Sequence, residues 1–88
     1  RARSAADLAA LAGAGAELRG RDACGAASRS AGANGARLVS CQVIGGRFDL
    51  RVRVEVATEL RPVLAGVHRE AIEVSVAGTD GVVAGSLP

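Results

Sequence analysis

Apolar and small residues in the first part of the chain recur at steps of three and four, which places them on one side of a helix. This set is Ala5, Leu8, Leu11, Ala12, Gly15 and Leu18. Alanine, the best helix former, dominates the remaining positions, so the pattern predicts a helix over residues 4–19. Gly20 ends this helix, and Asp22 is positioned to cap a second helix over Ala23–Ala33. The pair Asn34-Gly35 then supplies the left-handed conformers that close the second helix.

After residue 36 the chain changes from alanine-rich to valine-rich, and the period of its apolar residues falls to two. This alternation is typical of a strand with one buried and one solvated face. The clearest example spans residues 47–56, where charged residues alternate with Phe48, Leu50, Val52, Val54 and Val56. Another predicted strand is Arg37–Ile44, with Val39, Cys41 and Val43 facing inward. Gly45-Gly46 is expected to join the two as a two-residue hairpin, because both turn positions need positive φ.

A third strand is predicted where Ile72, Val74 and Val76 alternate with Glu73 and Ser75, and it could begin as early as His68. The preceding linker, residues 57–67, contains Pro62 and an apolar cluster, Leu60, Val63 and Leu64. It is expected to form a short helical turn or to cap the open end of the sheet. From residue 78 onward Gly, Ser, Thr and Pro accumulate, which predicts a flexible tail over residues 78–88 with a possible edge strand at Val82-Val83.

These elements assemble into one α+β domain over residues 1–77. Two N-terminal helices pack on one face of a three-stranded antiparallel meander, since such a sheet needs a helical cover to be stable. The chain has 88 residues, but only 22 of its apolar residues are larger than alanine or cysteine. A core this thin calls for a staple or a partner.

Cys24 and Cys41 are the only thiols, and their separation of 17 residues excludes a CxxC redox or zinc motif. One interpretation is a disulfide between the second helix and the first strand, which would contribute roughly 3 kcal/mol and imply an exported domain. The other is two separate buried thiols in a reducing compartment. The thin core favours the bridge.

Other chemistry is poorly represented. The net charge is only +2, and there is no Trp or Tyr and a single Phe, so neither a strong basic field nor base-stacking platforms point to a nucleic acid. His68 has no recognisable nucleophile beside it, and no metal-ligand, cofactor or catalytic spacing is present. We therefore expect no enzyme, no metal site, no cofactor and no small-molecule substrate. Arg51 and Arg53 are expected to pair across strands with Glu70 and Glu73.

Two stretches resemble the TadE-like proteins, minor pilin or pseudopilin relatives encoded with tight-adherence (Tad/Flp) pilus systems. Residues 3–12 read Arg-Ser-Ala-Ala-Asp-Leu-Ala-Ala-Leu-Ala, which is similar to the family's opening motif. Cys24, followed by residues 33–41, Ala-Asn-Gly-Ala-Arg-Leu-Val-Ser-Cys, and then alternating Val, is similar to the short, high-GC helicase/secretion-neighbourhood subgroup. The similarity covers roughly residues 1–77.

The resemblance implies a pilin-like fold and a non-enzymatic assembly subunit that packs against other pilin or pseudopilin subunits. It also implies a transmembrane helix upstream of Arg1 in the inner membrane, continuous with the first helix, and an extracytoplasmic location for this chain. One local signal opposes this, because Ser4-x-x-Asp7 has the spacing of a capping box that starts a helix afresh. The residues expected to pack between subunits are Ala9, Ala12, Gly13 and Ala16.

Two alternatives from other classes remain open. One is a secreted binding module that recognises a host or envelope protein through the solvated face of the sheet. The other is a small intracellular regulator with free thiols.

Overall fold

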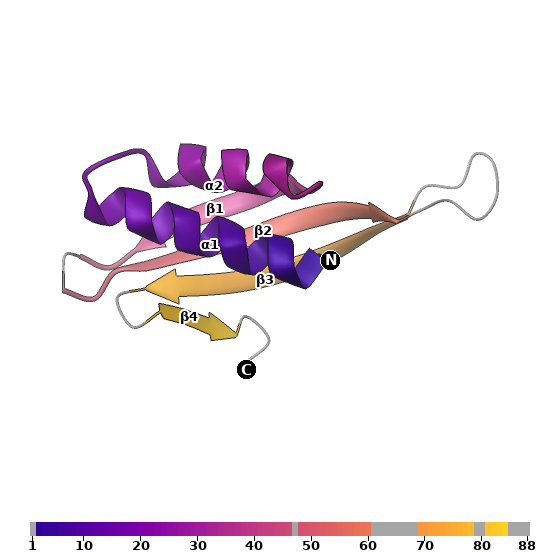
Figure 1. The fold of residues 1–88 in the computed structure, drawn as a ribbon. Helices are drawn as coiled ribbons and strands as arrows, with labels where there is room; N and C mark the ends of the chain where they lie inside the picture. Colours follow the sequence, from indigo (N-terminus) through magenta and orange to yellow (C-terminus); the bar gives the residue numbers. More distant parts are fainter. Residues whose placement is uncertain (1, 47, 61–68, 79–80, 85–88) are drawn as a thin grey trace.

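The computed structural model describes residues 2–46, 48–60, 69–78 and 81–84. Helices α1 (Ala2–Leu18) and α2 (Ala23–Ala33) lie side by side over one face of an antiparallel sheet (Figure 1). The sheet order follows the chain: β1 (Arg37–Ile44), β2 (Arg51–Leu60), β3 (Arg69–Gly78) and β4 (Gly81–Ala84). α1 packs over β2 and β3, and α2 packs mainly over β1. The predicted α+β class, with both helices on one face of an antiparallel sheet, is confirmed.

The helix ends follow from their glycines. Gly20 and Gly35 adopt φ values of 71° and 75°, and each lets the next residue bond back into the last helical turn. These bonds run from the Arg21 N–H to the Ala16 carbonyl and from the Ala36 N–H to the Ala31 carbonyl, both 2.8 Å. Gly and Asn-Gly therefore stop the helices where the sequence indicated, and the predicted bounds of α2 are confirmed.

The helix starts differ from expectation. α1 begins at Ala2, so Ser4 lies inside the helix and the capping-box interpretation of Ser4 and Asp7 is wrong. Asp22 occupies the N-cap position of α2, but its side chain makes no capping hydrogen bond. The start of α2 is therefore set by the turn that follows α1 and by packing, not by a side-chain cap.

The core is built from small helix residues and one row of valines. Val52, Val54 and Val56 of β2 are completely buried, and Leu50 extends the row toward the β1–β2 connection. Against them lie alanines from both helices, which are Ala5, Ala6, Ala9, Ala10, Ala14, Ala23, Ala27 and Ala31. The predicted inward positions of β2 are confirmed from Leu50 onward.

The connection between β1 and β2 corrects two predictions. It spans residues 45–50 and is therefore not a two-residue hairpin. Of the two glycines expected to need positive φ, Gly45 has a φ of 83° and Gly46 does not have a positive φ. The backbone of Gly45 lies directly against the Asp49 carbonyl, so the chain turns through a wider loop. Phe48 sits on this loop and is 90% exposed, not in the strand.

A bulge in β1 corrects a third prediction. The pairing with β2 shifts between Leu38 and Ser40, so two residues of β1 share one position of the ladder. As a result Leu38 and Cys41 both face the helices, whereas Val39 is exposed. Val43 keeps the inward direction but stays exposed near the end of this edge strand.

β3 presents its apolar residues to the face that the helices leave open. Its register sets Ser75 opposite Val54 and Ala77 opposite Val52, so these two small residues complete the buried face. Ile72, Val74 and Val76 consequently point to the other side of the sheet, where Ile72 is exposed.

The sheet also continues past the expected boundary at residue 77. β4 pairs with β3, with Val83 opposite Val76, so the edge strand at Val82-Val83 is confirmed and the sheet has four strands. The expectation of a flexible tail over residues 78–88 is therefore wrong for residues 81–84, which form β4. Most of the 57–67 linker, with Pro62, and His68 lie outside the described residues.

Gly13 lies where α1 closely contacts β2 and the start of α2. A Cβ atom there would lie 3.0 Å from Val52 Cγ1 and 3.2 Å from the Ala23 carbonyl oxygen. At Gly15 the nearest atom would be a guanidinium nitrogen of Arg19, at 3.4 Å, which is the mobile end of a long side chain.

We expect Gly13→Leu to lower the free energy of unfolding by about 2 kcal/mol or more, because a larger side chain would push α1 away from β2 and α2. Gly15→Leu is the matched control, and it should leave stability unchanged or raise it by up to about 1 kcal/mol through helix propensity. Urea unfolding of both variants measures the difference. Equal effects at the two glycines would contradict the close contact.

Candidate functional site

Three leucines form an exposed stripe along α1. Leu8, Leu11 and Leu18 are 46%, 43% and 57% exposed, although leucine is a side chain that proteins normally bury. Their spacing of three and seven residues keeps them on one side of the helix, with Gly15 between Leu11 and Leu18. We call Leu8, Leu11 and Leu18 the leucine stripe.

The stripe faces solvent because the opposite side of α1 carries the small residues that fit against the sheet. Ala9 and Ala10 are completely buried, and Gly13 meets Val52 with no space for a Cβ without adjustment. A leucine in any of these positions would hold α1 farther from β2. The helix therefore turns its alanines inward and its leucines outward.

A polar contact fixes the same rotation. The Ser75 hydroxyl, completely buried on β3, donates a 2.7 Å hydrogen bond to Oδ1 of Asp7 on α1. A buried hydroxyl without a partner would cost about 1–3 kcal/mol, so this bond favours the helix orientation that brings Asp7 over β3. The role of Asp7 within this domain is therefore to position α1.

Arg19 borders the stripe near its C-terminal end. Its guanidinium lies back along the helix beside Gly15, in the gap between Leu11 and Leu18. Regularly spaced apolar side chains on an exposed helix face suit packing against another helix. This surface offers a partner apolar contact area.

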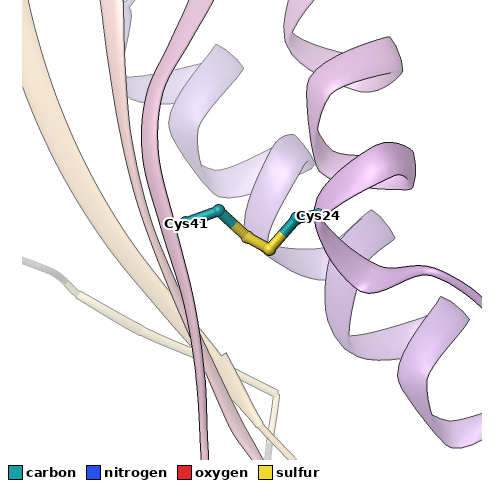
Figure 2. Close-up of a disulfide and its surroundings, with 2 residues drawn as sticks. All are labelled: Cys24 and Cys41. Carbon is teal, nitrogen blue, oxygen red and sulfur yellow. A yellow bond between two sulfur atoms is a disulfide. The ribbon is translucent and has the colours of Figure 1, made fainter.

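The predicted disulfide is present. Cys24, in the first turn of α2, is bonded to Cys41 in the middle of β1, with the two Cα atoms 5.8 Å apart (Figure 2). The bulge at Val39 helps to position it, because it keeps Cys41 directed toward the helix layer. The bridge therefore joins α2 to the edge strand that it covers.

The four residues predicted to pack between subunits have a different place. Ala9, Gly13 and Ala16 are buried within the domain, and Ala12 is partly buried beside them. Their burial corrects the prediction for at least three of them, since side chains enclosed by their own domain are not open to another subunit. Sequence reasoning selected the small residues of α1 and missed the leucines, although the leucine spacing was visible.

Arginines on the open face of the sheet pair differently from expectation. Arg53 contacts Glu55 on its own strand at 3.1 Å, and Arg51 lies 3.8 Å from Asp49. Glu70 instead pairs with Arg37 at 2.7 Å. The predicted pairing of Arg51 and Arg53 with Glu70 and Glu73 is therefore wrong. These partly or largely solvated pairs contribute little to stability.

Among residues 2–46, 48–60, 69–78 and 81–84, no group of His, Cys, Asp and Glu has an arrangement that could hold a metal ion. No helix within the same residues is long and apolar enough to cross a bilayer. Comparison with protein-family models, curated proteins and solved structures found no match to this chain.

Removal of the bridge tests its contribution to the domain. We expect Cys24→Ser with Cys41→Ser, or reduction of the native chain, to lower the free energy of unfolding by about 3 kcal/mol, because the bridge closes a loop of this length in the unfolded state. Urea unfolding with and without reductant measures the loss. Intact mass under non-reducing conditions should fall two daltons below the reduced mass, and an unchanged unfolding midpoint after full reduction would refute the stabilising role.

The Asp7–Ser75 bond gives an asymmetric prediction. Asp7→Ala should cost about 1–3 kcal/mol because it leaves the buried Ser75 hydroxyl without an acceptor, whereas Ser75→Ala should cost less because Asp7 is only partly buried. The double variant should be more stable than Asp7→Ala alone. A double-mutant cycle in urea measures the coupling, and strictly additive losses would mean that the two side chains act independently.

Proposed function

We propose that this chain is the extracytoplasmic domain of a membrane-anchored TadE-like subunit, a minor pilin or pseudopilin of a tight-adherence type IV pilus or secretion system. Its work is non-catalytic, since the domain packs against other pilin or pseudopilin subunits during assembly. The observation that carries this proposal is the leucine stripe on α1. A small domain with a thin core turns three of its large apolar side chains outward along one line, and such a line fits a partner helix.

Two further features support the proposal. The disulfide suits an oxidising location outside the cytoplasm. The motif of residues 3–12, which resembles the TadE-like opening, divides between two roles: Asp7 contacts Ser75 and orients the helix, while Leu8 and Leu11 face outward. In the proposed full-length subunit an upstream helix anchored in the inner membrane would continue directly into α1. The leucine stripe would then lie on the same rod as the anchor.

The stripe is tested in the cells that produce the protein. Leu8→Gln with Leu11→Gln should reduce surface pili at least tenfold, because burying the exposed halves of the two leucines at a subunit contact contributes about 2 kcal/mol. Glutamine is a good helix former and the two leucines are about half exposed, so the purified domain should stay folded and lose at most about 2 kcal/mol of stability. Pili counted by electron microscopy, with subunit abundance measured by immunoblot, give the result.

Ser28→Gln provides the matched control, because Ser28 is an exposed residue of α2 away from the stripe. It should leave piliation unchanged. Normal piliation in the double leucine variant would refute the stripe as the assembly surface.

A secreted binding module is the second candidate, and the open face of the sheet favours it, because Ile72 is exposed there. Ile72→Gln separates the two candidates. It should leave piliation intact if the leucine stripe acts alone, and it should abolish capture of a single saturable envelope or host protein if the domain works through its sheet.

A further inference from the structure

A projecting aromatic ring and a cleft lie together at one end of the molecule. At this end α1 stops and β1 leads into β2. Phe48, the only aromatic residue of the chain, is 90% exposed on the β1–β2 connection. A cleft of about 330 Å³ lies between this connection and the end of α1. It is lined by Glu17, Leu18, Gly20, Gly45, Gly46 and Leu50. We call this the distal cleft.

The distal cleft suits an aromatic side chain. Its three glycines carry no side chains, so a flat ring can lie directly on the backbone, while Leu18 and Leu50 offer apolar contacts. Glu17 places a carboxylate at the wall, which favours the positive edge of a phenyl ring. Its volume is at the small end of ligand sites, the size for one side chain rather than an extended ligand.

Phe48 does not fill the cleft of its own chain. It projects into solvent from the connection that forms one wall of the cleft. Leaving such a ring in water forgoes about 1.5–3 kcal/mol of burial. Val43 and Ile44, at the end of β1 just before this connection, are also exposed, on opposite faces of the sheet.

We propose that two copies of this chain form a symmetric dimer in which Phe48 of each copy inserts into the distal cleft of the other. A two-fold contact requires one surface to carry both a projection and its receptor, and this end of the domain carries both. The dimer shares Leu18 with the leucine stripe but uses neither Leu8 nor Leu11, and it does not rest on the proposed assembly contact.

The size of the contact sets its strength. Each ring buries about 150–200 Å², so the two rings come to about 300–400 Å², well below the roughly 1,000 Å² of specific stable interfaces. The dimer should therefore be weak, with a dissociation constant of about 100 μM, equivalent to about −5.5 kcal/mol. Crowding of subunits on a membrane or a filament would favour it through effective concentration.

The experiment uses the chain with its disulfide intact. Sedimentation velocity from about 10 μM to 1 mM brackets the expected dissociation constant. Phe48→Ala removes the projection. Gly46→Trp blocks the receptor without strain, because Gly46 lacks a positive φ and a Cβ there would meet no atom within 4 Å. Gly32→Trp is the matched control, because Gly32 on α2 has the same open surroundings.

We expect Phe48→Ala and Gly46→Trp each to weaken dimerisation at least tenfold, and Gly32→Trp and Leu8→Gln with Leu11→Gln to leave it unchanged. In a mixture of ¹³C-labelled and unlabelled chains, isotope-filtered NOEs should connect the Phe48 ring of one copy to the α-protons of Gly20, Gly45 and Gly46 of the other. Monomeric native chain at 1 mM would overturn the proposal, as would NOEs from the Phe48 ring to Leu8 and Leu11, which lie outside the distal cleft. Loss of dimerisation in the Leu8 and Leu11 variant would also overturn it, because it would assign self-association to the stripe.

Discussion

Close contact between the small-residue side of α1 and the valine row of β2 is the constraint on which the rest of the domain depends. Ala9 and Ala10 are completely buried in this contact, and Gly13 brings the helix backbone to within van der Waals distance of Val52 and α2. Helices that approach a sheet this closely leave no space for leucine. The outward direction of the leucine stripe is therefore a consequence of the core and needs no separate cause.

The disulfide offsets the stability that the domain loses by leaving the leucine stripe exposed. Each leucine of the stripe is about half exposed, so it forgoes about 1 kcal/mol of burial, or about 3 kcal/mol for the three. The bridge between Cys24 and Cys41 contributes about the same amount by constraining the unfolded chain. The bridge also acts where packing is weakest, because it ties α2 to β1, an edge strand that carries a bulge.

Local signals made much of the architecture predictable. Gly20 and Asn34-Gly35 mark helix ends through backbone conformations that other residues rarely adopt, and the bounds of α2 and β1 followed from such signals. The Cys24–Cys41 pairing was inferred from the thin core and is confirmed. Each of these features depends on a few neighbouring residues or on the number of large apolar residues, so it can be predicted directly from the sequence.

The buried face of each helix and strand was harder to predict. Periodicity shows which residues share a side, but it does not show which side turns toward the core. In α1 the leucines and the alanines both form apolar sides, and only contact with the Val52 row decides between them. In β3 the register with β2 sets Ser75 inward against the apparent pattern, and in β1 the bulge at Val39 reverses the alternation. The prediction that Phe48 lies in the strand was wrong for a similar reason. The alternation of apolar and charged residues in the sequence starts before residue 51, where β2 begins.

The proposed binding surfaces consist of residues whose direction was not predicted from the sequence. The two properties have one physical cause. A side chain whose hydrophobicity disagrees with its position keeps apolar surface in water, so a contact from outside gains the burial of that exposed part. Leu8 and Leu11 lie on α1, whereas Phe48 lies on the β1–β2 connection, which Figure 1 shows at one end of the domain, so their contacts would run in different directions. A subunit with both could meet one neighbour through Leu8 and Leu11 and another through Phe48 at its end, with Leu18 at the border between the two contacts.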